Sequence, residues 1–156
     1  LEVREAIDLS DWEVYYEIYQ DSLNRWGNRV SSEYKRDLFT ILSQLDSSFC
    51  KLWLIQNKEN VISGCICFYF NKHVVYWHGA SLESFFDLRP VHVLQYRIIE
   101  HAVKYNFKYY DFNPSGGHKG VEKFKKGFGT ETIPANVYNH QPFLIEKIFN
   151  LSRSLR

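Results

Sequence analysis

The sequence predicts an α/β fold with one mixed sheet, an α+β arrangement of antiparallel and parallel strands. Three β-rich runs follow one another between residues 49 and 80, and the turns between them are too short for parallel crossovers. A helical pattern then separates the last of these runs from another strand-like run at residues 107–112. A strand–helix–strand unit requires a parallel pair. The sheet is therefore expected to combine an antiparallel meander with one parallel pair.

Length and composition agree with a globular domain. The 156 residues fit one domain, 1–156, which can bury a core without disulfide bonds. Hydrophobic residues make up 45% and charged residues 24%, which excludes a disordered segment, a collagen-like repeat and a coiled coil. The net charge of +1 divides into −4 for residues 1–100 and +5 for residues 101–156. The basic third either attracts phosphates or nucleic acid or forms a solvated basic face.

The first third of the chain predicts an edge strand and two helices. Residues 2–7 alternate as an edge strand does. Ser10 and Glu13 have the spacing of a capping box at the start of a helix that ends at Gly27. The serines at 31–32 are cap candidates for a second helix. The apolar residues of that second helix are Leu38, Ile41, Leu42 and Leu45.

The rest of the chain predicts five strands and three further helices. Pro90 suits the first turn of a helix after a loop at residues 81–88. The expected strands are Phe49–Ile55, Val61–Phe70, His73–Ala80, Phe107–Phe112 and Thr130–Tyr138. The other expected helices are His118–Lys126 and Phe143–Leu155.

Two motifs in the last third carry a resemblance to a known family. The segments Tyr109–Pro114 (YYDFNP) and Gly120–Gly129 (GVEKFKKGFG) resemble the strand end and the F-K-x-x-F-G helix of FemAB-like transferases. Tyr76–Ala80 and the Arg89-Pro90 helix start are also similar, and the resemblance extends over nearly the whole chain. The element order β-α-α-β-β-β-α-β-α-β-α is likewise that of the GNAT acetyltransferase superfamily.

The resemblance implies both a fold and an activity. It implies a GNAT-like acyl-CoA N-acyltransferase fold and the transfer of an acyl or aminoacyl group to an amine. FemAB-like enzymes are built from two GNAT-like halves, and this chain resembles the C-terminal half. We therefore expect residues 1–156 to be either a complete GNAT-like domain or the C-terminal half of a longer protein. The absence of methionine agrees with a processed or excised chain.

Lys125 is the leading catalytic candidate. Helical spacing places it on one stripe with Val121, Phe124 and Phe128. Taken alone, such a lysine packs its stem on phenylalanine and sends its ammonium group to water. The family resemblance implies instead that Lys125 stabilises charge on the acyl oxygen and that Phe124 helps to shape the site.

Asp111 and the loop after it are the second group of candidates. Asp111 stands at a strand end, where it either orients or deprotonates an attacking amine or accepts backbone N–H bonds in the loop. Asn113, Gly116 and Gly117 are candidate substrate-binding residues, because glycines before a helix expose backbone amides to an anion.

Tyr76 and His78 are candidate substrate-binding residues on the strand His73–Ala80. Two residues apart on a strand, they are expected to share one face. The corresponding strand of GNAT enzymes faces the acyl donor, which favours His78 over the other histidines. A single histidine on a strand is nonetheless more often a satisfied interior group.

The segment before Pro90 bears on the acyl donor. CoA-dependent GNAT enzymes carry a Q/R-x-x-G-x-G/A loop there, whereas residues 84–90 contain no glycine. Side chains hinder a close approach of the backbone to pyrophosphate, and Pro90 has no N–H to donate. Arg89 is a candidate substrate-binding residue that would supply one ionic contact in place of that loop. The donor is therefore expected to be either acyl-CoA, bound weakly, or aminoacyl-tRNA.

The sequence favours an N-acyltransferase whose acceptor is a small-molecule or peptide amine. The alternative is a non-catalytic GNAT-like module that docks a partner half, a tRNA end or a cell-wall precursor. No permanently bound cofactor and no metal are expected, since the C-x-C pair Cys65 and Cys67 lacks matching ligands. Together with Cys50 these are expected to be reduced thiols. No apolar run reaches 18 residues, so no membrane span is expected, and the expected location is cytoplasmic.

Overall fold

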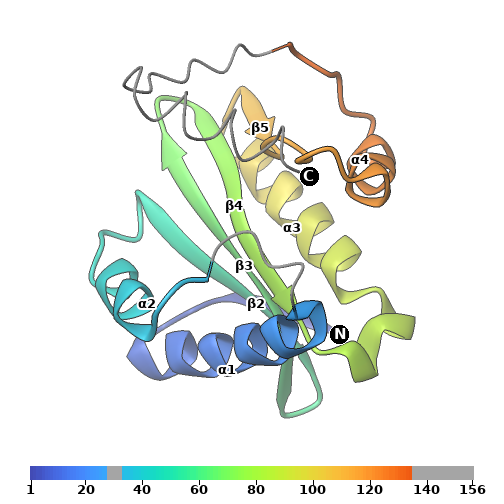
Figure 1. Cartoon of the computed structure of the whole chain (residues 1–156). Helices are drawn as coiled ribbons and strands as arrows, with labels where there is room; N and C mark the ends of the chain where they lie inside the picture. The colour runs from blue at the N-terminus through green and yellow to red at the C-terminus, as the bar shows by residue number, and fades with distance from the viewer. Residues whose placement is uncertain (28–32, 135–156) are drawn as a thin grey trace, which may run out of the picture. The chain divides into compact units, whose positions relative to one another are not determined.

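The computed structural model describes residues 1–27 and 33–134. It divides into two compact units, Leu1–Gly116 and Gly117–Arg156, and each is described by itself. In the first unit five strands form a sheet in the order β1-β2-β3-β4-β5 (Figure 1). The strands are β1 (Glu2–Glu5), β2 (Cys50–Asn57), β3 (Asn60–Phe70), β4 (His73–Ser81) and β5 (Tyr109–Asp111).

The pairing of the strands confirms the predicted mixed α/β fold. Strands β1 to β4 pair antiparallel in chain order, and β4 pairs parallel with β5. The turn between β3 and β4 consists of Asn71 and Lys72, which both have positive φ, 46° and 63°. Positive φ at both central residues suits a two-residue hairpin, because its twist then matches that of the strands.

Helices lie on both sides of the sheet. Helices α1 (Leu9–Trp26) and α2 (Arg36–Ser43) lie on one side of the ribbon in Figure 1, and α3 (Pro90–Lys104) lies on the other. A 3-10 helix, η2 (Glu83–Leu88), occupies most of the expected loop before α3. The second unit contains α4 (Lys119–Lys126). Residues 130–134 form no strand, and the expected elements at 135–138 and 143–155 lie outside the described residues.

The start of α1 differs from the predicted capping box. Asp8, not Ser10, is the N-cap, and its side chain accepts hydrogen bonds from the N–H groups of Ser10 and Asp11. Ser10 already lies inside the helix, so its hydroxyl cannot cap it and instead donates to Asp8. These contacts hold the pKa of Asp8 below its usual value, with the Ser10 bond as the main cause. Gly27 ends the helix as predicted, with φ 53°.

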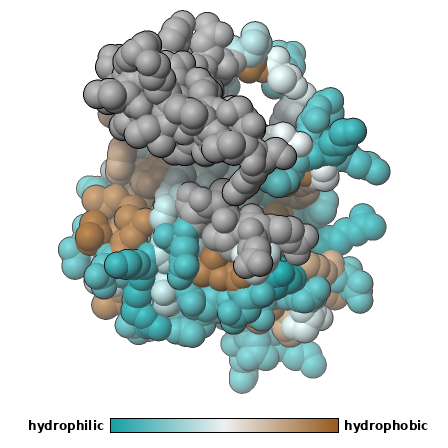
Figure 2. Space-filling view, viewed as in Figure 1, coloured by the Kyte–Doolittle hydropathy of each residue, from teal (hydrophilic) through white to brown (hydrophobic). Residues whose placement is uncertain are grey.

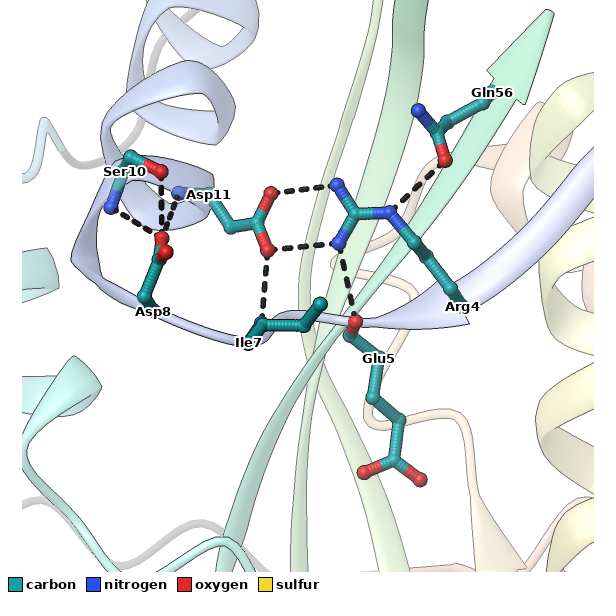
Figure 3. A network of polar contacts seen from close by, with 7 residues as sticks. All are labelled: Arg4, Glu5, Ile7, Asp8, Ser10, Asp11 and Gln56. Atoms are coloured by element: carbon teal, nitrogen blue, oxygen red, sulfur yellow. Dashed lines mark hydrogen bonds and ion pairs between the residues drawn. The ribbon is translucent and has the colours of Figure 1, made fainter.

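An ion pair ties α1 to the edge of the sheet. Arg4 of β1 binds both carboxylate oxygens of Asp11, at 2.7 and 2.6 Å, and its Nε donates to Gln56 of β2 at 2.9 Å (Figure 3). Asp11 also accepts the N–H of Ile7 at 2.8 Å. The hydrogen bond from Arg4 is the main reason why the pKa of Asp11 lies below its ordinary value. The planar guanidinium thus fixes where the first helix leaves the sheet.

Helix α2 begins at Arg36, with Lys35 at the N-cap and no side-chain cap. The serines at 31–32 that were expected to cap it lie outside the described residues. Of the expected apolar residues Leu42 is buried, together with Phe39. The prediction is wrong for Ile41, which is 58% exposed, and for Leu45, which lies beyond the end of the helix and is 38% exposed. Hydrophobic residues gather on the left of the face seen in Figure 2, where α2 lies in the same view, beside a largely hydrophilic surface.

Two hydrophobic clusters lie on the two faces of the sheet. The first packs α1 and α2 against β2, β3 and β4, and it is rich in aromatic residues. The second packs α3 against β2, β3 and β4. We call these sides the α1–α2 face and the α3 face. No helix within the described ranges is long and apolar enough to cross a membrane.

Candidate active site

Strands β4 and β5 pair over only a short stretch. They pair from His73 and Tyr109 to Val75 and Asp111, over three residues of β5. Beyond that point β4 continues to Ser81, and no other strand in the described part of the chain pairs with that edge of it. We call this stretch, where β5 has ended and β4 has no paired strand beside it in the described residues, the opening between β4 and β5; the candidates Tyr76 and His78 lie on it.

A β-bulge at Trp77 changes the direction of the candidate side chains. His78 pairs with Ile66 and Tyr76 with Cys67, so Trp77 is an extra residue in β4. Tyr76 packs on the α3 face, whereas Trp77 packs on the α1–α2 face and the ring of His78 lies against that same cluster. The expectation that Tyr76 and His78 share a face is therefore wrong, because the extra residue reverses the alternation between them.

His78 is anchored in the aromatic cluster of the α1–α2 face. Its Nδ1 shares a 2.5 Å hydrogen bond with the hydroxyl of Tyr15 on α1. Rings of five aromatic residues lie within 6 Å of its own ring, centroid to centroid. They are Tyr15, Tyr19, Tyr34, Phe39 and Trp77. Burial among these rings lowers the pKa of His78 from 6.5 to about 4, so the imidazole is neutral at pH 7.

The hydrogen bond with Tyr15 indicates which tautomer His78 adopts. Tyr15 is fully buried, and burial raises its pKa well above 10, so its hydroxyl stays protonated. A buried hydroxyl group needs a hydrogen-bond acceptor for its hydrogen. Within the described residues the partner of the Tyr15 hydroxyl is Nδ1 of His78. Nδ1 is therefore the acceptor, and Nε2 carries the hydrogen of the neutral ring. The structure gives Nε2 no hydrogen-bond partner within residues 1–27 and 33–134.

Gly64 of β3 makes room for this arrangement. A Cβ at position 64 would lie 2.5 Å from Cδ2 of Tyr15 and 3.0 Å from Cδ2 of Leu54. Any larger residue would therefore push the Tyr15 ring away from the sheet. Neither Tyr15 nor Gly64 was among the site residues predicted from the sequence. A glycine inside a strand often marks a place where another group approaches the backbone closely. Gly64 was therefore the signal in the sequence that could have indicated this contact.

Tyr76 lies in a different environment from His78. Its ring packs with that of Phe112 at 6.3 Å, and its hydroxyl lies over Gly79, where a Cβ would overlap it. Burial raises the pKa of Tyr76 well above 10. Burial also raises the pKa of the neighbouring Cys65 thiol to about 12, so this thiol is not a nucleophile near neutral pH.

Asp111 and Asn113 fix the chain as it leaves β5. Asp111 accepts a 2.7 Å hydrogen bond from the Asn113 N–H, which is the structural contact expected as one alternative for it. Asn113 has φ 59°, and its Nδ2 donates to the carbonyl of Tyr76 at 2.7 Å. This bond connects the loop to β4 at the point where the opening begins. Asp111 is half exposed, and its catalytic role stays a prediction.

The glycines and the arginine predicted to bind substrate occupy separate places. Gly116 and Gly117 have φ of 58° and 79°, values that favour glycine. Arg89 lies before α3, is exposed and has a left-handed φ of 49°. The N–H groups of Phe85 and Arg89 already bond to the carbonyls of Leu82 and Phe86. The roles of these residues toward a substrate stay predictions.

In the second unit, Lys125 is the buried residue of α4, with 8% of its surface exposed. The rings of Phe124 and Phe128 pack edge to face at 5.3 Å, as the predicted stripe requires. Val121, the first member of that stripe, is 40% exposed. The lysines that were expected to point elsewhere are exposed, and they are Lys119, Lys123 and Lys126. The predicted functions of Lys125 and Phe124 remain predictions.

Within residues 1–27 and 33–134, no group of three or more His, Cys, Asp or Glu side chains is arranged to hold a metal ion. Along β4 beyond Val75, the available hydrogen-bonding groups are the neutral imidazole of His78 and the backbone groups of an edge that no described strand pairs with. Such groups position substrates and stabilise charge through hydrogen bonds.

Comparisons with known proteins identify relatives of the fold. The family described as "Acetyltransferase (GNAT) domain" matches residues 1–126. No curated protein sequence is significantly similar to the chain.

Three solved structures illustrate the similarity. A ribosomal-protein-alanine N-acetyltransferase from Brucella melitensis biovar Abortus 2308 has 9% identity and a TM-score of 0.70, over 90% of this chain and 100% of that one. An aminoglycoside acetyltransferase from an uncultured soil metagenomic sample, in complex with sisomicin, has 7% identity and a TM-score of 0.68, over 90% and 96%. The ribosomal-protein-S18-alanine N-acetyltransferase from Escherichia coli has 9% identity and a TM-score of 0.65, over 82% and 76%. At these identities the similarity concerns the fold.

Proposed function

The chain belongs to the GNAT acetyltransferase domain family, and from that premise we propose that it transfers an acyl group to an amine at the opening between β4 and β5. The family match confirms the predicted class of enzyme, an N-acyltransferase. One observation carries the choice of site. At this opening His78 has one ring nitrogen bound in the core and the other without a protein partner in the described residues.

His78 acts in this proposal as a hydrogen-bond donor. Its Nε2–H donates to the carbonyl oxygen of the acyl donor while the amine nitrogen attacks the carbonyl carbon. The new C–N bond forms, the bond from the acyl carbon to the leaving group breaks, and the amine proton leaves with the leaving group or to water. A donor fixed by Tyr15 in a poorly solvated site stabilises the developing oxyanion without reorganisation.

Substitutions of His78 test that role. In His78→Asn the amide nitrogen or oxygen replaces Nδ1 and the donor at Nε2 is lost, so we expect kcat/KM to fall by roughly 10²–10³. In His78→Gln an amide N–H lies near the position of Nε2, and we expect a loss of only about tenfold. The control is His101→Gln on α3, a histidine on the opposite face of the sheet. Equal losses in the Asn and Gln variants would contradict a donor role at Nε2.

Lys125 is proposed as a catalytic cation on the resemblance of its motif to FemAB-like transferases. Its burial on α4, while the neighbouring lysines are exposed, supports a role beyond the solvation of that helix. Lys125→Met keeps the length of the side chain and removes the charge. We expect kcat to fall by roughly 10²–10³ with the fold retained. Lys126→Met is the control, because that lysine forms an exposed ion pair with Glu122. Equal activity of the two variants would end this assignment.

The donor is proposed to be acyl-CoA held weakly, with aminoacyl-tRNA as the alternative. The segment before α3 supports weak binding, because the N–H groups of Phe85 and Arg89 are already bonded and Pro90 has none. We expect a dissociation constant for acetyl-CoA well above the low micromolar range by titration calorimetry. If aminoacyl-tRNA is the donor, affinity for it will fall steeply as salt rises.

The acceptors of the structural neighbours supply a first panel for the assay. A peptide with an N-terminal alanine represents the ribosomal-protein N-acetyltransferases, and sisomicin represents the aminoglycoside enzyme. Transfer to either would support the proposed function. Absence of acyl transfer from both donors to every amine tested, with a folded protein, would overturn it.

A further inference from the structure

A buried polar network lies on the α3 face, opposite His78. Gln95 of α3 has no exposed surface. Its Nε2 donates to Sγ of Cys65 on β3 at 3.4 Å, and its Oε1 accepts a 2.5 Å bond from the hydroxyl of Tyr110 on β5. The hydroxyl of Tyr76 is a further polar neighbour of Cys65. One carboxamide therefore connects α3, β3 and β5.

A glutamine is an unfavourable choice for this position if only packing matters. It lies among the apolar residues of the α3 face, where a polar group loses its hydration. Leucine or methionine would fill the same volume without that cost. Both ends of the carboxamide are satisfied, however, so the network is directional in a way that apolar contacts are not. The two hydrogen bonds of Gln95 thus fix the positions of the groups that they join, which an apolar side chain of the same size would not do.

The element that these hydrogen bonds position is strand β5. This strand has three residues, and its backbone pairing with β4 ends at Val75 and Asp111. Tyr110 is its central residue, and its hydroxyl reaches across to Gln95. Just beyond the paired residues, the Asn113 side chain reaches across to the carbonyl of Tyr76 on β4. The position of β5 relative to β4 therefore rests on a backbone ladder of only three residues together with these two side-chain bonds.

We propose that Gln95 is a positioning residue for the acyl donor: by holding Tyr110 to β3, it sets the width of the opening between β4 and β5. This inference rests on the proposed function, because it takes that opening to be the donor site. Gln95 itself is buried and touches no substrate; it acts through β5. Binding of the donor should therefore depend on Gln95 more than binding of the amine does.

The test compares Gln95→Met and Tyr110→Phe with a matched control. Both variants remove the bond between the two residues and keep the approximate shape of the side chain. Gln20→Met is the control, because Gln20 is a glutamine of α1 whose Nε2 is buried without a partner among the described residues. With acetyl-CoA as the donor, we expect KM for the donor to rise about tenfold in both variants, while KM for the amine changes less than twofold. The double variant should be no worse than Gln95→Met, because both changes break one contact.

Hydrogen exchange provides a readout that needs no activity. Backbone amides of Tyr110 and Phe112 should exchange at least tenfold faster in Gln95→Met than in the Gln20→Met control. An active Gln95→Met enzyme whose donor KM matches that of the wild type would overturn the proposal and leave the proposed function intact. Equal rises of KM for donor and amine would also overturn it, since they indicate general destabilisation. A folded wild type without transfer activity would overturn the proposed function, and the donor role of Gln95 with it.

Discussion

The two faces of the sheet differ in how a buried polar side chain on each is hydrogen-bonded. On the α1–α2 face His78 has one nitrogen bound by Tyr15 and leaves the other to a partner outside the described protein residues. On the α3 face Gln95 uses both ends of its carboxamide within the protein. Both arrangements flank the same opening between β4 and β5. In our proposals, the α1–α2 face therefore supplies a hydrogen-bond donor for the substrate, and the α3 face positions strand β5.

The bulge at Trp77 makes this division possible. Regular alternation would send Tyr76 and His78 to the same face, but the extra residue separates them. A phenol and an imidazole that are two residues apart in sequence thus serve different sides of one strand. Changes on each side of the strand should accordingly affect different properties of the protein.

The largest effect on stability is expected for Gly64→Ala on the α1–α2 face. The added Cβ would come within 2.5 Å of the Tyr15 ring, which is fully buried and cannot move outward freely. We expect a loss of about 2–3 kcal/mol in the free energy of unfolding, measured by denaturant titration. Because the Tyr15 hydroxyl would leave His78, kcat should fall as well. A variant of normal stability and activity would show that Tyr15 does not need its present position.

Acid should destabilise the protein through His78. Its pKa is about 4 in the folded state and 6.5 when unfolded, so between these values the unfolded chain binds the proton and the folded protein does not. Stability is therefore fully present above pH 6.5 and falls as the pH drops toward 4. We expect a contribution of about 2 kcal/mol, less than the full shift implies because the side chain is partly exposed. In His78→Asn this part of the pH dependence should disappear; its persistence would contradict the assignment.

A smaller effect is expected for Gly79→Ala on the α3 face. The new Cβ would overlap the hydroxyl of Tyr76, which is the far end of its side chain and can tilt away. We expect a loss of about 1 kcal/mol in unfolding free energy. Removing the obstructing atom in the double variant Gly79→Ala, Tyr76→Phe should recover most of it, since the next atom of the ring is 3.1 Å from the Cβ. A double variant less stable than Gly79→Ala would contradict this account.

The sequence predicted the fold better than the site, for physical reasons. Short turns and hydrophobic periodicity are local properties, so the antiparallel strands and the parallel pair were predictable. The bulge was not, because it depends on how β3 and β4 pair rather than on the residues of β4 alone. The bond from Tyr15 to His78 joins residues 63 positions apart, and no local pattern indicates it. Asp8 was missed as the N-cap because Ser10 and Glu13 also fit a capping pattern.

The smallest effect concerns the joint between β1 and α1, which is at the sheet edge opposite β5. Arg4→Lys keeps the positive charge but cannot bind both oxygens of Asp11 and Gln56 together. We expect a loss of about 0.5–1 kcal/mol in unfolding free energy and unchanged KM for donor and amine. Arg36→Lys, in an exposed pair with Glu17, is the control and should change almost nothing. If Arg4→Lys raised the donor KM as Gln95→Met is expected to do, loss of stability alone would explain both, and the assignment of separate roles to the two faces would fail.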